Sequence, residues 1–189
     1  IQVLAPEDIN SEAAATQLES LRPNLYVVCD YGQILSNDAL AIPPLGGINL
    51  HGSILPKYRG AAPVHWAVMN GDEQTGITVI HMTPKLDGGP VLTVRTTPIG
   101  EHETTEQLEP RLALIGVEAV HEAIKMLESW DNESPLGEKQ DPALARRAPR
   151  LKKADGAVDW SQSVASPYNQ FRALKPWPGS FPQRQHPHG

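Results

Sequence analysis

The sequence predicts an α/β domain built on a mainly parallel sheet. Short apolar runs rich in β-branched residues alternate with longer segments of helical periodicity, and several of these runs end in loops rich in glycine, serine and proline. The chain has 189 residues, of which 40% are hydrophobic and 20% charged, which is typical of one globular domain with room for part of another. In such sheets, ligands bind beyond the carboxyl ends of the strands.

Four segments have the residue pattern of helices. Asn10 or Ser11 is a typical N-terminal cap for the first of them, Ser36 and Thr104 mark the expected starts of two others, and proline or glycine follows several of the expected ends. Pro110 lies in the early part of the longest segment and predicts either a kink or a later start. The expected helices are residues 11–21, 36–42, 62–70 and 104–130.

Four apolar runs are expected to form strands, because they are short and rich in β-branched residues. Cys29, the only cysteine, ends the first of them, so the chain has no internal disulfide and fits a reducing compartment. We expect Cys29 to be a buried structural thiol. The strands are residues 26–29, 47–51, 77–82 and 91–97, and residues 1–4 form an extended edge.

Several classes of protein are excluded by missing patterns. No apolar run approaches the roughly 20 residues of a membrane span. The sequence has no Gly-x-Gly-x-x-Gly or phosphate loop for a nucleotide cofactor, no Gly-x-Ser-x-Gly turn for a nucleophilic serine, and no metal-ligand spacing. His186 and His188 lie in a segment expected to be an unstructured tail, so we expect no metal site there.

The net charge of −6 is unevenly distributed. Residues 1–138 have 7 basic and 19 acidic side chains, whereas residues 139–189 have 9 basic and 3 acidic ones. A basic run in the second part is either a solvated linker or a positive patch beside a phosphate-bearing partner. It consists of Arg146, Arg147, Arg150, Lys152 and Lys153. The expected division is a first domain at 1–130, a linker at 131–154, and the start of a second domain with a tail at 155–189.

The strongest functional signal is the pair Asn49 and His51, at the end of the second expected strand. Residues i and i+2 of a strand face the same way, so both side chains can point at one reacting atom. A neutral amide donor beside a titratable imidazole suits the stabilisation of a developing oxyanion. The alternative is a polar pair at the end of a buried strand, without a catalytic role.

A second signal is the run Leu86-Asp87-Gly88-Gly89, in the loop after the third strand. An aspartate before two glycines allows an exposed carboxylate and a close approach of the backbone. At the same sheet edge as His51, Asp87 can keep the imidazole protonated or relay a proton through water. A simple turn is the alternative. The chemistry that fits is direct attack by a bound nucleophile on a bound carbonyl, without a covalent enzyme intermediate.

These residues, with the loop Tyr58-Arg59-Gly60-Ala61-Ala62-Pro63, resemble the 10-formyltetrahydrofolate-dependent formyltransferases. The resemblance covers about residues 1–181. It implies a Rossmann-like sheet with helices on both faces and a linker toward a C-terminal β-barrel domain. The family's first strands and most of its barrel would then lie outside this sequence, which would be a fragment. The loop, with Asp155-Gly156-x-x-Asp159-Trp160 and Pro176-Trp177-Pro178-Gly179, looks most like the branch that acts on methionyl-initiator tRNA.

The resemblance also implies roles for individual residues. Asn49, His51 and Asp87 match the family's catalytic trio, and no metal is implied. Gln33 departs from the pattern, since an apolar residue is common at its position in the family. The residues that match folate-contacting segments are Ser53, Ile54, Leu55 and Pro56; Tyr31, Gly32, Ile34 and Leu35; and Met82, Thr83 and Leu86.

The expected activity is therefore transfer of a formyl group from 10-formyltetrahydrofolate to the α-amine of methionyl-initiator tRNA. This reaction would link one-carbon metabolism to translation initiation. The expected partners are this tRNA, for the full-length protein, and the folate; a cytoplasmic monomer without membrane contact is expected. Two alternatives stay open: another formyl-folate enzyme, acting on water or a sugar amine, and a non-catalytic folate-binding module.

Overall fold

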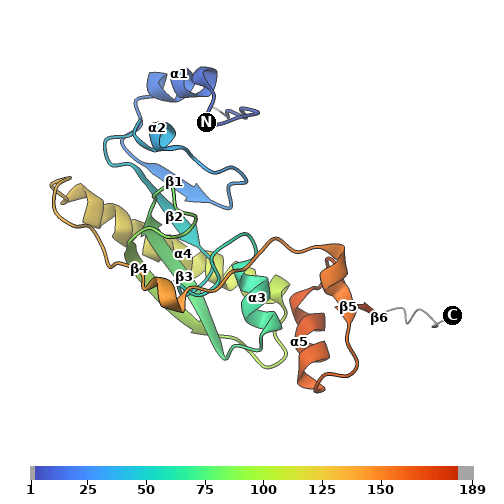
Figure 1. The fold of residues 1–189 in the computed structure, drawn as a ribbon. Helices are drawn as coiled ribbons and strands as arrows, with labels where there is room; N and C mark the ends of the chain where they lie inside the picture. Colours follow the sequence, from blue (N-terminus) through green and yellow to red (C-terminus); the bar gives the residue numbers. More distant parts are fainter. Residues whose placement is uncertain (1–2, 183–189) are drawn as a thin grey trace.

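The computed structural model describes residues 3–182, and its centre is a four-stranded sheet in the order β1-β2-β3-β4 (Figure 1). The strands of this sheet are β1 (Tyr26–Cys29), β2 (Gly47–His51), β3 (Gln74–His81) and β4 (Val91–Pro98). The helices are α1 (Glu12–Ser20), α2 (Asn37–Leu40), α3 (Pro63–Met69), α4 (Thr105–Glu128) and α5 (Ala165–Ala173). The remaining elements are the 3-10 turns η1 (Pro142–Leu144) and η2 (Lys153–Gly156) and the short strands β5 (Ala157–Val158) and β6 (Phe181–Pro182).

The strand directions correct one part of the predicted fold. β1 and β2 are parallel, but β3 runs antiparallel to both β2 and β4, so the described sheet is mixed rather than mainly parallel. A parallel neighbour needs a crossover that returns the chain along the sheet. α3 has seven residues, about 10 Å of helix. Thr78 of β3 pairs with His51 at the end of β2, so the chain re-enters the sheet at the end that it left.

Most of the predicted elements are confirmed. β1 and β2 have the predicted bounds, and α1, α2 and α4 begin directly after Ser11, Ser36 and Thr104, whose side chains accept hydrogen bonds from backbone N–H groups. α4 contains Pro110 and starts without delay. β3 begins three residues before the predicted start.

Two predictions concern the ends of the chain. Residues 3 and 4 belong to no strand, and the other two residues of the predicted edge lie outside the described part. His186 and His188 also lie outside it.

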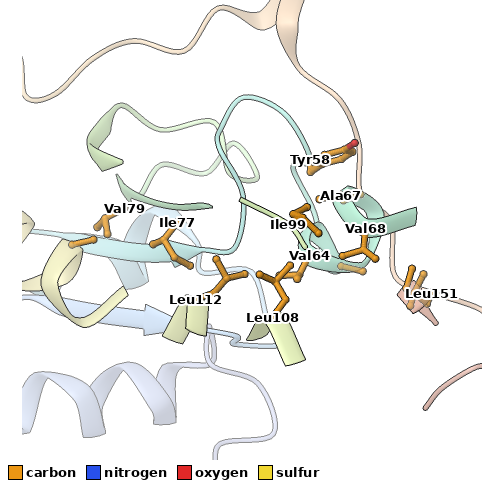
Figure 2. Close-up of a cluster of buried hydrophobic side chains, with 14 of the residues drawn as sticks. Tyr58, Val64, Ala67, Val68, Ile77, Val79, Ile99, Leu108, Leu112 and Leu151 are labelled. Atoms are coloured by element: carbon orange, nitrogen blue, oxygen red, sulfur yellow. The ribbon is translucent and has the colours of Figure 1, made fainter. Parts of the chain in front are cut away.

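Alternation along β2 separates the core from the opposite face of the sheet. Ile48 is fully buried, and Leu50 packs closely against α4, where a Cβ added at Gly116 would lie 3.1 Å from the Leu50 side chain. Asn49 and His51 point to the other face. α4 covers the core face with buried residues at helical spacing, and Figure 2 shows two of them, Leu108 and Leu112, in the main apolar cluster.

A smaller apolar cluster lies on the Asn49 face, at the amino end of β2. A Cβ added at Gly47, two residues before Asn49, would touch Met82, Tyr26 and Leu40. The buried members of this cluster are Ile9, Leu35 and Ala39, which come from the α1–α2 region. Helices therefore lie on both faces of the sheet, as predicted.

β1 is less buried than predicted. Val27 is 52% exposed and the Cys29 side chain is exposed, so the expectation of a buried thiol is wrong. The physical reason is that β1 is the edge strand of the described sheet, with β2 as its hydrogen-bonded neighbour. A short apolar run alone does not distinguish an edge strand from a central one.

The C-terminal part lies beside the sheet rather than within it (Figure 1). α5 packs against α3, and β5 pairs with β6 in a separate parallel pair. Arg172 of α5 is buried and donates hydrogen bonds to the carbonyl oxygens of Gly100 and Glu103. Within residues 3–182, every helix is too short or too polar to cross a membrane.

Candidate active site

A cavity of about 810 Å³ lies at the ends of β1 and β2, and it is lined by Asn49 and His51 as well as by Leu50, which points to the other face of the sheet. Three loops form most of its wall: residues 29–35 after β1, residues 60–65 at the start of α3, and residues 82–87 after β3. α4 contributes a fourth side, and Arg150 reaches it from the segment that follows α4. Segments that follow β1, β2 and β3 thus line one cavity.

Asn49, His51 and Asp87 lie together at this cavity. The Asn49 Nδ2 donates to Asp87 Oδ1 over 3.4 Å, and His51 Nδ1 lies 3.7 Å from the same oxygen. The His51 side chain is nearly buried, and its Nε2 lies 2.8 Å from the carbonyl oxygen of Tyr58. A carbonyl oxygen can only accept, so the hydrogen-bond geometry assigns a hydrogen to Nε2 and directs Nδ1 toward Asp87.

The loop that carries Asp87 does not start at the predicted edge of the sheet. Because β3 is antiparallel, its carboxyl end lies beside the amino end of β2, with His81 opposite Ile48. The loop after β3 therefore folds back across the sheet instead of starting at the edge where β2 ends. The prediction of a shared carboxyl edge is wrong for this loop, although its outcome, contact between Asp87 and His51, is correct.

Two contacts fix the course of this loop near Asp87. The Asp87 backbone has a φ of 46°, in the left-handed region, and its Oδ2 accepts a hydrogen bond of 2.8 Å from the backbone N–H of Gly60. At Gly89, an added Cβ would overlap the carbonyl oxygen of His81. The second glycine of the Asp-Gly-Gly run is therefore required by close backbone approach.

Seven of the eleven predicted folate-contacting residues line the cavity. Those on the loop after β1 are Tyr31, Gly32, Ile34 and Leu35, and those after β3 are Met82, Thr83 and Leu86. Tyr31, Ile34 and Leu86 are large and exposed at 44%, 65% and 55%. Exposed apolar side chains on the wall of a cavity suit the binding of a flat, largely apolar ligand.

The other four, residues 53–56, do not line this cavity. Ser53 is fully buried, and its hydroxyl donates to the carbonyl oxygen of Lys57 over 2.6 Å. Thr78 Oγ1 donates to the Ser53 carbonyl oxygen, which ties the turn to β3. Ile54, Leu55 and Pro56 border a separate hollow with Lys57 and Asp72. These four residues form a tightly bonded turn, and this is why adjacency to His51 in sequence does not bring them to the cavity.

The unusual Gln33 has a structural explanation. Its Oε1 accepts a hydrogen bond of 2.8 Å from the backbone N–H of Ile9, and its Nε2 donates to the carbonyl oxygens of Pro6 and Glu7. An apolar residue could not make these bonds. Gln33 therefore holds the segment before α1 against the loop that lines the cavity.

Sequence reasoning missed a second titratable pair at the cavity, His65 of α3 and Glu109 of α4. Their Nδ1 and Oε1 atoms are 4.0 Å apart. Burial lowers the pKa of His65, whereas burial, together with the negative charges of Asp30 and Glu106, raises the pKa of Glu109. Both shifts favour the neutral forms and so disfavour an ion pair between the two side chains. No sequence motif marks Glu109, which comes from a helix across the cavity.

Arg150 belongs to the basic run of the sequence and lines the cavity. Arg146, Arg147 and Arg150 are all exposed. Metal ligands form no comparable cluster: within residues 3–182, no three His, Cys, Asp or Glu side chains are grouped so that they could hold a metal ion.

The family models match both parts of the chain. Residues 2–124 match the model described as formyl transferase, and residues 150–185 match the model for the formyl transferase C-terminal domain.

Curated relatives are much longer than this chain. A methionyl-tRNA formyltransferase of Rhodopirellula baltica is 53% identical over 184 residues, and one of Anaeromyxobacter dehalogenans is 42% identical over 181 residues. The alignments cover 96% of this chain in both cases, but 55% and 57% of the relatives. The chain thus spans about half the length of the curated relatives that it matches.

Solved structures share the fold at low sequence identity. A sugar N-formyltransferase from Shewanella sp FDAARGOS_354 has a TM-score of 0.74 at 18% identity, over 94% of this chain and 71% of that protein. HypX from Aquifex aeolicus, in complex with tetrahydrofolic acid, has a TM-score of 0.72 at 20% identity, over 88% of this chain and 28% of that one. At such identities the likeness concerns the fold alone.

Proposed function

The chain belongs to the formyl transferase family, and on this premise we propose that the full-length protein transfers the formyl group of 10-formyltetrahydrofolate to the α-amine of methionyl-initiator tRNA. The observation that carries the proposal is the contact of Asn49, His51 and Asp87 at one cavity. The acceptor rests on the curated relatives, which are named methionyl-tRNA formyltransferases. We place the reaction in the cytoplasm, where charged initiator tRNA serves translation, and propose a monomer.

The folate is proposed to bind in the cavity between Tyr31 and Ile34 on one side and Leu86 on the other. These side chains are exposed and line the cavity. Burying their apolar surface against a pterin ring would stabilise the complex by about 25 cal/mol for each Å² removed from water. That HypX is named as a complex with tetrahydrofolic acid supports a folate for this fold.

In the proposed reaction the amine nitrogen attacks the formyl carbon while the folate N10 is still bonded to it. A new C–N bond forms, and the electron pair of the carbonyl π bond moves to the oxygen, which becomes an oxyanion. The Asn49 Nδ2 and a protonated His51 Nδ1 donate hydrogen bonds to that oxygen. The tetrahedral intermediate then collapses: the C=O bond re-forms, the bond to N10 breaks, and tetrahydrofolate leaves.

Asp87 is proposed to move the proton. The attacking amine must lose a proton and N10 must gain one, so the two transfers balance. The Asp87 Oδ2 is held by the Gly60 N–H, whereas Oδ1 faces Asn49 and His51. The carboxylate can stabilise the protonated imidazole. It can also accept the amine proton through water, and this proton is then transferred to N10.

The proposal is tested by measuring tetrahydrofolate release from 10-formyltetrahydrofolate with the full-length protein. The acceptors are methionyl-initiator tRNA, glycinamide ribonucleotide, a nucleotide-linked amino sugar, and water alone. Release that depends on charged initiator tRNA supports the proposal. Release with another amine or with water would keep the chemistry of the trio and replace the acceptor, and folate binding without release from any acceptor would identify a binding module.

A further inference from the structure

The segment after α4 is tied to both loops that meet at Asp87. We call residues 138–148 the strap. Near its start, Glu138 and Val91 exchange two backbone hydrogen bonds of 2.7 and 2.8 Å. Near its end, the N–H of Arg59 donates to the carbonyl oxygen of Arg146 over 2.8 Å, and the N–H of Ala148 donates to that of Arg59 over 2.7 Å. The strap is therefore held in place at both ends.

The strap also lies close to the residue that holds the Asp87 carboxylate. Ala148 is fully buried, and a Cβ added at Gly60 would lie 2.5 Å from its carbonyl oxygen. Gly60 has a φ of 126°, in the left-handed region. Only glycine allows this approach while the Gly60 N–H stays directed at Asp87.

Between these two ends, the Gln140 side chain joins both loops. Its Nε2 donates to the carbonyl oxygens of Asp87, over 2.8 Å, and of Gly89, over 2.7 Å. Its Oε1 accepts from Arg59 Nε over 3.1 Å and from Nη2 over 2.6 Å. The amide thus uses both of its N–H hydrogens and both lone pairs of its oxygen, a complete set of bonds for a half-buried side chain.

We propose that Gln140 is a positioning residue for Asp87, an inference that rests on the proposed function. Gln140 bonds the Asp87 backbone and also Arg59. The next residue, Gly60, bonds the Asp87 carboxylate. Both the backbone and the carboxylate of Asp87 are thereby fixed relative to His51. Gln140 itself is not among the residues that line the cavity, so it acts through Asp87 and not on the substrate.

The test compares Gln140→Glu with Gln170→Glu in the full-length protein. Gln170 is a matched control, because its Nε2 also donates to two backbone carbonyl oxygens, those of Asp155 and Ala157, but away from the cavity. In Gln140→Glu a carboxylate oxygen replaces the Nε2 amide group and repels the carbonyl oxygens of residues 87 and 89. The other carboxylate oxygen can still accept hydrogen bonds from Arg59.

The expected result is a selective loss of turnover. A displacement of about 1 Å at a catalytic group can cost on the order of 10²-fold in rate, so we expect kcat of Gln140→Glu to fall about 10- to 100-fold. The KM for the folate should stay within about twofold, because Gln140 bonds the loop at residues 87 and 89 and not at Leu86, which is proposed to contact the folate. Gln170→Glu should keep the wild-type kcat. A kcat of Gln140→Glu equal to that of the control would overturn the inference.

Hydrogen exchange separates this inference from the proposed function. Amide exchange of residues 83–90 should be faster in Gln140→Glu than in wild type, and unchanged in Gln170→Glu. If the wild type transfers formyl groups to none of the acceptors, the proposed function fails, and exchange alone decides the role of Gln140. Unchanged exchange at residues 83–90 then overturns the positioning role, and faster exchange upholds it.

Discussion

Two regions supply the trio, and they hold their side chains by different means. Asn49 and His51 stand on β2, which is hydrogen-bonded to β1 on one side and to β3 on the other. Ile48, between β1 and β3 and fully buried against the core, fixes which face the two polar residues occupy. Their placement follows from strand register and from the apolar residues that alternate with them.

The loop after β3 holds Asp87 without such support. Residues 83–86 are exposed, and Asp87 is bonded to groups far along the chain. Gly60 is 27 residues away and Gln140 is 53 residues away. The comparison teaches that a substitution remote in sequence can displace Asp87 while it leaves Asn49 and His51 in place.

The largest effect is expected for the strand-borne imidazole. In the full-length protein, His51→Ala should lower turnover by about 10²–10³-fold, as for the removal of other oxyanion donors. Folate affinity should change little, because the apolar side chains proposed to contact the folate, Tyr31, Ile34 and Leu86, are unchanged. Steady-state kinetics and a folate titration measure the two quantities. His121→Ala, at an exposed position of α4, is the control. Near-normal turnover of His51→Ala would refute the proposed role.

A somewhat smaller effect is expected for the loop-borne carboxylate. Asp87→Asn keeps the size of the side chain and an oxygen that can accept from Gly60, but it removes the negative charge that faces His51. We expect turnover to fall about 10²-fold, the lower end of the range for general acid–base groups. Asp38→Asn, on the exposed surface of α2, should have wild-type activity. Equal activities of the two variants would show that the Asp87 charge is unnecessary.

The glycines of the loop give a sharper comparison within one segment. Gly89→Ala places a methyl group on the His81 backbone, which cannot move without disturbing β3, so we expect a loss of about 1–3 kcal/mol of unfolding free energy. Gly88→Ala meets the flexible Lys85 side chain, with the Cβ 2.6 Å from its Cγ, and should be tolerated better. Urea denaturation measures both variants. If Gly88→Ala is the less stable of the two, the loop does not follow the described course.

The smallest effect is expected for the pH dependence of stability, and it concerns His65 of α3, which lines the same cavity. Burial lowers the pKa of His65 in the folded chain below the ordinary value, about 6.5, which the unfolded chain retains. The unfolded state then binds the proton more readily, so acidification through that value costs stability. His65→Gln should lose less stability than wild type between pH 7.5 and 5.5 in urea denaturation. An identical loss in both would contradict the shift.

Local sequence patterns predicted most of the helices and strands, and they predicted the placement of Asn49 and His51. The period of two along residues 47–51 places Asn49 and His51 on one face, and capping residues mark the starts of α1, α2 and α4. The predicted strand directions were wrong for β3, because alternation of strands and helices does not specify whether a short helix returns the chain along the sheet. Cys29 was misjudged for a related reason, since an apolar run does not reveal its place in the sheet.

Contacts between distant segments account for what sequence reasoning missed. Nothing in the run around Gln140 indicates that its amide bonds the backbone at Asp87, and nothing in α4 marks Glu109 as part of a cavity wall. Residues 53–56 illustrate the limit of adjacency in sequence, and their contact with folate stays a prediction. These residues follow His51 directly and match a family motif, but the buried Ser53 hydroxyl bonds the Lys57 carbonyl and the chain turns away from the cavity.

The loop that carries Asp87 begins and ends at one point of the sheet, where the backbone N–H of His81 donates to the carbonyl oxygen of Pro90 over 2.9 Å. A loop whose two ends are hydrogen-bonded to each other can be replaced by one of another length, since the pairing of β3 with β4 then stays in register. Protein engineers could therefore vary residues 83–88 to move the carboxylate relative to a fixed imidazole. The mixed sheet makes the reach of Asp87, the proposed proton acceptor, adjustable independently of Asn49 and His51.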